Sequence, residues 1–142
     1  MPVQMTNEDL TIYNRYPAGR EGDKWTRTVI TGISWYKSVR SAITSAGYQS
    51  AEVHEIRIPL TASVENAKRF VPPGAFKDAD KESSWTIQSG DKVVRGIASV
   101  EPDDIDLDSR LEREYADAAN VTAFSDNRRG DIHGQHWRIE AA

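Results

Sequence analysis

Short segments of alternating apolar and polar residues, separated by turns that contain glycine or proline, most limit the folds open to this chain. The strongest segment is residues 25–36, WTRTVITGISWY, which is rich in aromatic and β-branched residues. Within it Val29, Ile33 and Trp35 share one parity. Alternation with a period of two is typical of a strand that buries one face. Gly32 interrupts the alternation and predicts a bulge or a bend.

Seven segments carry this signature, and each predicts a short strand. They are residues 10–16, 25–36, 52–60, 85–88, 92–100, 120–125 and 135–140. The sequence Ser89, Gly90, Asp91 is a turn signal, which predicts that the fourth and fifth segments form a hairpin. The last two segments predict a second hairpin. Together with one short helix, the pattern predicts a mostly β fold, a small β-barrel or sandwich of about seven strands.

The length of 142 residues is usual for one domain, so residues 1–142 are expected to form a single β-barrel-like unit. Residues 1–8 are polar and are expected to be flexible. Residues 103–119 predict the one helix, because Leu107, Leu111 and Tyr115 recur at every fourth position. Aspartates fill the start of this segment, where the helix dipole favours negative charge.

Composition excludes several classes of function. The chain has no cysteine, which removes disulfide scaffolds, thiolate metal sites and a cysteine nucleophile. No apolar run is long enough for a transmembrane helix or a signal peptide, so we expect a soluble intracellular protein. The formal net charge of -4 argues against sequence-independent nucleic-acid binding over the whole surface.

Candidate catalytic and metal-ligating residues are few. The histidines are His54, His133 and His136, and only the last two are close in sequence. Glycines interrupt that segment, so we do not expect the two imidazoles to converge on a metal ion. A set of Ser125, Asp126 and His133 lacks any nucleophile motif. The sequence therefore predicts no catalytic residue, no metal, no cofactor and no enzyme activity.

Two charged segments leave alternatives open. Residues 101–117 hold eight acidic residues against Arg110 and Arg113. This composition suits a solvated helix face, an interface with a basic partner, or a wall that repels DNA. Residues 126–130, DNRRG, suit an ordinary charged hairpin loop or ion pairs with the acids of a neighbouring subunit.

Residues 37–51 differ from the segments on either side. They contain no acidic residue in an otherwise acidic chain, and their apolar residues are widely spread. This composition predicts a long, mobile loop that joins the two strongest strands. Structureless loops of this length inside a compact domain are usually functional.

Four stretches, taken together, resemble a family of small proteins of undefined role encoded in the structural modules of tailed bacteriophages and prophages. They are RTVITGISWY at residues 27–36, RIP at 57–59, WTIQSGDKVVRG at 85–96, and DNRRG at 126–130 with HWRI at 136–139. Their order resembles the head-closure (stopper) proteins of the head-to-tail connector. Those proteins are small β-barrels with a long loop after an early strand and a C-terminal strand.

The resemblance implies a homo-oligomeric ring, commonly of twelve copies, in the neck of the virion. Such a ring lies beneath the portal and adaptor rings, closes the channel on the packaged DNA and docks the tail. The chain would be made in the cytoplasm of the host bacterium, would bind no membrane and would stay monomeric until it meets its partners. A tail terminator, another neck protein, and a minor capsid or decoration protein are the alternatives.

The resemblance and the charge pattern together select two sets of residues. The loop is expected to approach the channel axis and to contact either the DNA or the other copies of the ring through Lys37, Arg40, Ser41, Ser45 and Gly47. A disordered surface loop and a strand-exchange arm to a neighbour are the alternatives. The two cations could approach phosphates, and the small residues would let many copies crowd round an axis. The subunit interface is expected to use Arg128, Arg129, His136 and Arg138. The family pattern implies no role for the acidic helix at residues 103–119.

Overall fold

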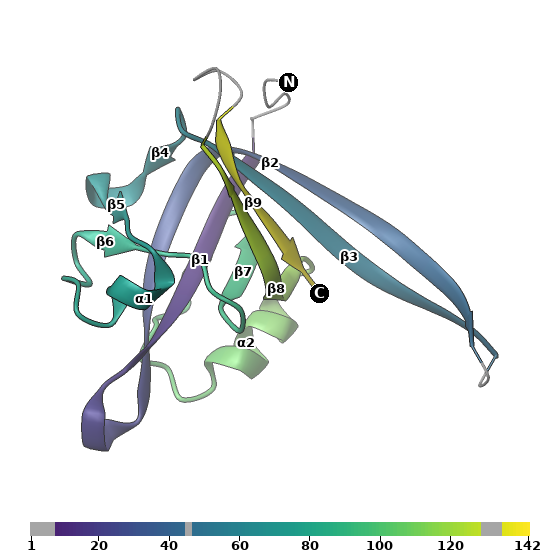
Figure 1. Ribbon diagram of the computed structural model, residues 1–142. Coiled ribbons are helices and arrows are strands. Elements are labelled where there is room, and N and C mark those ends of the chain that lie inside the picture. The colour runs from purple at the N-terminus through teal and green to yellow at the C-terminus, as the bar shows by residue number, and fades with distance from the viewer. Residues whose placement is uncertain (1–7, 45–46, 129–134) are drawn as a thin grey trace.

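A computed structural model describes residues 8–44, 47–128 and 135–142, and within them the chain forms a closed β-barrel (Figure 1). Six strands surround the barrel in the order β1-β7-β8-β9-β3-β2, and pairing of β1 with β2 closes it. A further strand, β4, pairs with β2. The mostly β prediction is confirmed, and the chain adopts the barrel rather than the sandwich.

The strands of this sheet differ widely in length. Their bounds are β1 (Glu8–Pro17), β2 (Asp23–Thr44), β3 (Gly47–Pro59), β4 (Ser63–Val64), β7 (Lys92–Arg95), β8 (Ala118–Asn127) and β9 (His136–Ala141). The predicted strands at residues 10–16, 120–125 and 135–140 correspond to β1, β8 and β9, and β8 and β9 form the predicted hairpin. Residue 8 begins β1, so only residues 1–7 of the segment expected to be flexible lie outside the described residues.

The other elements are short. A two-stranded parallel sheet joins β5 (Arg69–Phe70) to β6 (Ser84–Trp85). The helices are α1 (Pro73–Phe76) and α2 (Leu107–Glu114), and 3-10 turns lie at Gly19–Glu21 and Glu65–Ala67.

Gly32 forms the predicted bulge in β2. Glu8 lies opposite Ile33 and Asp9 lies opposite Thr31, so Gly32 has no partner residue on β1. Its φ of +83° lies in the left-handed region that glycine adopts at no steric cost. The extra residue shifts the alternation of β2 by one position. Ile33 is therefore buried together with Ile30, although the two residues differ in parity.

Apolar side chains fill the barrel, as expected for a closed sheet of few strands. The buried members of this cluster are Leu10, Ile12, Ile30, Ile33, Trp35, Ile56, Ile58, Trp85, Ile87, Val93, Ala119, Val121, Trp137, Ile139 and Ala141. At one end of the barrel the rings of Trp85 and Trp137 meet edge to face, with their centroids 5.3 Å apart. Phe70 packs against both rings.

Helix α2 covers the outside of the barrel and is shorter than predicted. Leu107 and Leu111 are buried in a second cluster with Tyr13 and Val94 of the sheet, as their spacing predicts. Extended backbone at Tyr115 ends the helix. The predicted extension of the helix to residue 119 is wrong, because residues 118–120 pair with β7 as the start of β8. Strand pairing there outweighs the local helical spacing.

The predicted hairpin at residues 85–100 is wrong. Strand β6 pairs with β5, whereas β7 pairs with β1 and β8. The turn is instead held against β1 by the buried carboxylate of Asp91. This group accepts hydrogen bonds from Asn14 Nδ2 (2.7 Å), the Arg15 backbone N–H (3.0 Å) and two donors of Gln88, its backbone N–H (3.1 Å) and Nε2 (3.2 Å). Burial outweighs these donors and raises the pKa of Asp91 to about 6.

The predicted long loop at residues 37–51 is also wrong. Strands β2 and β3 continue as an antiparallel pair from Lys37 opposite His54 to Thr44 opposite Gly47. The register is already fixed inside the barrel, where Trp35 lies opposite Ile56. Each further pair of residues can therefore join a ladder that is already formed, without alternating apolar residues to direct it.

Replacement of Trp35 by alanine should lower the free energy of unfolding by about 3–5 kcal/mol, because this side chain is buried in the barrel core. The measurement is urea denaturation followed by circular dichroism. Tyr36→Ala is the matched control, since the neighbouring Tyr36 is 46% exposed and should cost about 0.5 kcal/mol or less. Equal losses for the two variants would contradict the assignment of Trp35 to the core.

Replacement of Asp91 by alanine should cost about 3 kcal/mol, because four donors in a mostly buried site lose their acceptor. The matched control is Thr86→Val in the same cluster. The Thr86 hydroxyl is buried and has no hydrogen-bond partner among the described residues, so its removal should be neutral or stabilise the fold by about 1 kcal/mol. Thermal and urea unfolding of both variants test the pair.

Candidate functional site: an extended arm and an aromatic groove

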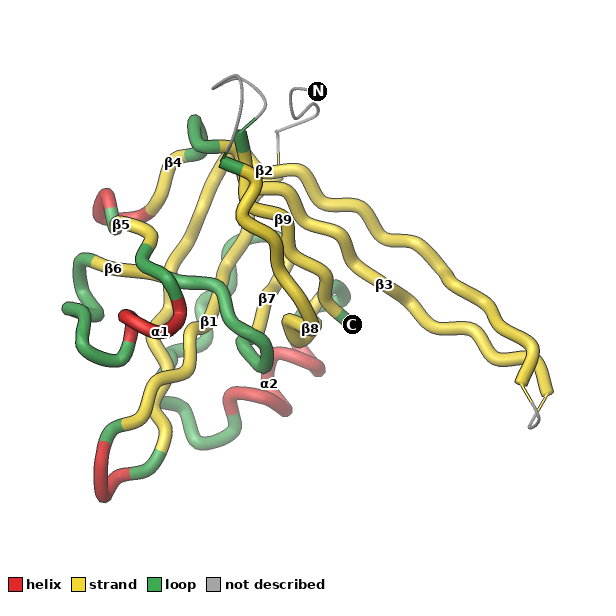
Figure 2. The backbone as a smooth tube through the Cα atoms, in the orientation of Figure 1, coloured by secondary structure: helices red, strands yellow, loops and turns green. Residues whose placement is uncertain are grey.

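An arm of two strands leaves the barrel between β1 and β9. We define it as residues 38–44 of β2 and 47–53 of β3. Figure 2 shows the two strands running together away from the other elements. Strand β1 pairs with β2 only as far as Ile33, and β9 pairs with β3 only as far as His54. Within the described residues, the two strands of the arm therefore pair only with each other.

Such an arm is exposed in two ways. Its outer edges present backbone N–H and C=O groups that no described strand satisfies. Near its root it also carries Val39, which is 65% exposed. A hairpin of two strands without a supporting face is marginally stable in water. Free edges of this kind are where another chain can add a strand.

At the root of the arm, a buried aromatic pair marks the end of the barrel core. The indole Nε1 of Trp35 donates a hydrogen bond of 3.0 Å to Nδ1 of His54, and the two rings meet edge to face. Both side chains are buried. Because Nδ1 accepts this bond, the imidazole carries no proton on that nitrogen. Burial lowers the pKa of His54 below its ordinary value.

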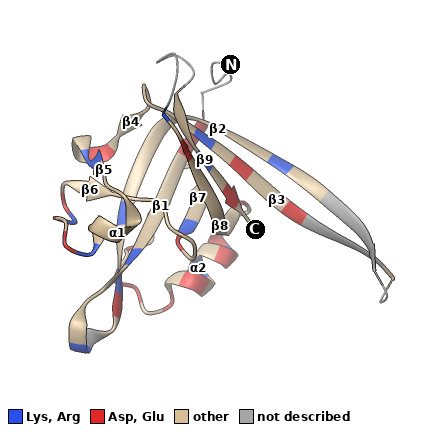
Figure 3. Cartoon of the chain, in the orientation of Figure 1, with Lys and Arg blue, Asp and Glu red and all other residues tan. Residues whose placement is uncertain are grey.

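A series of ion pairs links oppositely charged side chains around the root of the arm. The ammonium of Lys37 lies 3.5 Å from the Glu52 carboxylate and 3.4 Å from that of Asp117. Asp117 also pairs with Arg95, whose Nε donates to Glu8 at 2.8 Å. The Arg95 hydrogen bond lowers the pKa of Glu8. Figure 3 shows both basic and acidic positions on β2 and β3 where the two strands leave the barrel.

The structure describes the side-chain contacts of only some of the residues predicted to face the channel. Lys37 is held between two carboxylates, so its charge is already balanced within the chain. Gly47 begins β3 with a φ of +107°, a conformation suited to glycine. Arg40 and Ser41 belong to β2, but their side chains lie outside the described part of the structure, as does the whole of Ser45. Contact of this set with DNA stays a prediction.

The residues predicted at a subunit interface have partners within the chain. Arg128 Nε donates to Asp126 at 2.7 Å, and its guanidinium lies over the rings of Phe70 and Trp137. Arg138 bonds to the carboxylates of Glu55 and Glu140. His136 Nε2 lies 3.4 Å from the amide nitrogen of Asn127. Arg129 lies outside the described residues. The interface role of this set also stays a prediction.

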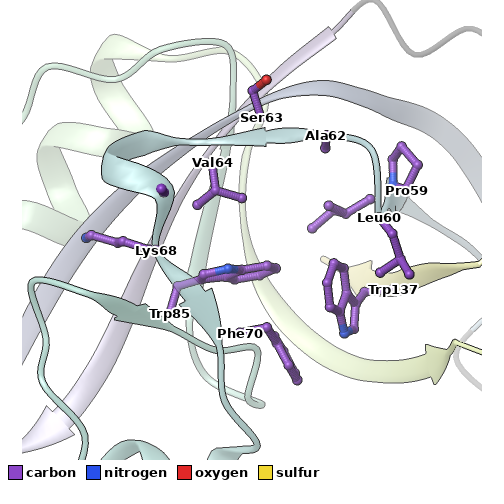
Figure 4. Close-up of a pocket in the computed structure, with 11 residues that line it drawn as sticks. Pro59, Leu60, Ala62, Ser63, Val64, Lys68, Phe70, Trp85 and Trp137 are labelled. Carbon is purple, nitrogen blue, oxygen red and sulfur yellow. The ribbon is translucent and has the colours of Figure 1, made fainter.

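A groove of about 440 Å³ opens beside Trp85 and Trp137, at the end of the barrel where β3 leads into β4 (Figure 4). We call it the aromatic groove. Apolar side chains line it from three parts of the chain: Ile58, Leu60, Val64, Phe70, Trp85 and Trp137. Lys68 forms part of the wall, but its ammonium is bound to the Arg27 carbonyl and the Thr28 hydroxyl. The sequence pattern does not reveal this groove, because its residues are far apart in the chain.

The residues weighed for catalysis or metal binding do not form a site among the described residues. No group of three histidine, aspartate or glutamate side chains gathers there around a possible metal position. His133, which belongs to both hypothetical sites, lies outside the described residues. In the part of the chain that is described, no helix is long and apolar enough to span a membrane.

The buried His54 should titrate below the ordinary histidine pKa of about 6.5, and nuclear magnetic resonance of its imidazole would measure the midpoint. A pKa lowered by folding means that the unfolded chain binds the proton more tightly. The contribution of His54 to stability is therefore complete above about pH 6.5 and is lost as the pH falls below it. Trp35→Phe should raise the midpoint, because the hydrogen bond to the neutral imidazole is removed. A wild-type midpoint at or above 6.5 would contradict this prediction.

Comparison with curated proteins and with solved structures gives no match. A family model matches almost the whole chain, over residues 5–142, and its description is Family of unknown function (DUF6751). The match includes the barrel, the arm and the aromatic groove. The chain therefore belongs to the DUF6751 family.

Proposed function

We propose that this protein is a structural subunit of the tailed-phage virion, a head-closure (stopper) component of the head-to-tail connector ring. The observation that carries the proposal is the arm, which extends from a closed barrel with both of its edges free among the described residues. The resemblance implies a long loop after an early strand, and at that place the chain instead has a hairpin of the strands β2 and β3.

The arm is costly for a monomer, which supports a role in assembly. Closing a barrel removes the edges of a sheet, and this chain closes its barrel. The same two strands nevertheless continue outward and expose new edges. At the rise of a β-strand, seven residues per strand carry the tip about 23 Å beyond the root. An arm of that length can reach a neighbouring subunit or the centre of a ring.

The charges at the root suggest how such an arm would block a channel. Lys37 is neutralised by Glu52 and Asp117, so the root offers DNA no free cation from this residue. The chain as a whole is acidic, and a ring of copies adds this charge around its axis. We therefore propose that closure is chiefly steric, by the backbone ladder of the arms, and that the wall of the ring repels the DNA.

Removal of the arm should abolish closure and leave the barrel folded. The variant joins Ser38 to Val53 through an Asn-Gly turn, which keeps every ladder pair inside the barrel. We expect an unchanged near-ultraviolet circular dichroism spectrum, but loss of packaged DNA from tail-less heads, measured as nuclease-protected DNA per head. The matched control replaces only residues 45 and 46 by Asn-Gly and should retain the DNA.

Three outcomes would count against the proposal. Heads built with the arm-less chain could keep their DNA as well as the control heads do, which would remove the stopper role. Electron microscopy of particles that carry a tagged copy could place the chain on the capsid surface, which would favour a decoration protein. A position on the axis at the head-proximal end of the tail tube would favour a tail terminator.

A further inference from the structure

The arm leaves the barrel at one row of residues. In that row Lys37 of β2 lies opposite His54 of β3, and His54 lies opposite Ala141 of β9. Strand β9 pairs no further along β3, so within the described residues each later row is only two strands wide. The row itself is fixed to the core, because the buried rings of Trp35 and His54 are in contact. Two-stranded ribbons twist more than wider sheets, so bending is easiest just outside this row.

The ammonium of Lys37 is shared between two carboxylates that belong to different parts of the molecule. Glu52, at 3.5 Å, lies on β3 within the arm, where it is next to the residue opposite Ser38. Asp117, at 3.4 Å, lies outside the arm, in the connection between α2 and β8. One contact therefore stays inside the arm, whereas the other ties the arm to the barrel.

The barrel holds Asp117 in place through its neighbours. Its backbone C=O accepts a hydrogen bond of 2.9 Å from the backbone N–H of Arg95, and its carboxylate lies 3.4 Å from the Arg95 guanidinium. Arg95 belongs to β7 and its Nε donates in turn to Glu8 of β1 at 2.8 Å. Asp117 is therefore the fixed partner of the ion pair, and Lys37 is the partner that moves with the arm.

Both charges keep a partner when the contact between Lys37 and Asp117 breaks. Lys37 retains Glu52, and Asp117 retains Arg95. An uncompensated charge in a partly buried site would make separation costly, and none is created here. The side chains of Lys37 and Asp117 are 38% and 19% exposed. Separation therefore costs little more than the small free energy of one partly exposed ion pair.

We propose that the ion pair between Lys37 and Asp117 is a latch, which holds the arm in its projecting direction. When the latch opens, the arm rotates about the row of Lys37 and His54. The use of this latch rests on the proposed function, because arms that close a channel must move aside when the DNA leaves. The low cost of opening suits that use, since contacts with a neighbouring ring can readily exceed it.

Distances between two spin labels in the purified chain test the latch. The chain has no cysteine, so Thr44→Cys at the end of β2 and Ser125→Cys in β8 give one labelled pair. Thr44 lies about 23 Å beyond Lys37 along the strand, so a small rotation at the root changes the distance measurably. At low salt the parent chain should give one main distance. Asp117→Asn should increase the population outside that distance about two- to fivefold, the effect of losing one partly exposed ion pair.

A second variant and a matched control accompany this measurement. Lys37→Gln removes the same contact from the other side and should give a similar increase, and the double variant should add nothing further. Asp104→Asn is the control, because it breaks the 2.6 Å ion pair to Arg110, which does not involve the arm, and it should leave the distances unchanged. In about 1 M salt, where charges are screened within about 3 Å, the parent chain should approach the distances of Asp117→Asn.

The outcomes are distinct from those of the stopper test. Distances in Asp117→Asn equal to those of the parent chain would overturn the latch, and so would an equal change in the control or a parent chain insensitive to salt. A salt-sensitive latch together with arm-less heads that retain DNA would leave the latch standing and remove the stopper role. Loss of DNA from arm-less heads without any change of distance in Asp117→Asn would support the stopper role and remove the latch.

Discussion

The structure depends on strand β2, which forms part of both the barrel and the arm. Strand β2 has 22 residues and pairs with β1, β3 and β4. Residues 23–33 pair with β1 and close the barrel, residues 34–37 pair with β3 inside it, and residues 38–44 form one side of the arm. Gly32 lies near the end of the first part, where its positive φ allows the bulge. A residue with a side chain at this position would strain the bulge and with it the pairing that closes the barrel.

The barrel could be predicted because its strands carry their own pattern. In β3, His54, Ile56 and Ile58 alternate with polar residues, and all three are buried as the alternation requires. The turn at residues 89–91 and the end of the helix at residues 103–119 were predicted wrongly for a common reason. Contacts between residues far apart in the sequence determine the structure of both segments. Asp91 is bound by donors of β1, more than 70 residues away in sequence, so its turn could not be recognised as a docked turn from local residues. Residues 118 and 119 were likewise predicted as helix, but they pair with β7.

The position of the arm could be predicted from the sequence, but its structure could not. Residues 37–51 stand out because they lack acids, and the structure does place an unusual feature there, the arm. What composition could not predict is the balancing of Lys37 by Asp117, a residue 80 positions away. The aromatic groove was missed entirely, since Phe70, Trp85 and Trp137 become neighbours only when the barrel closes.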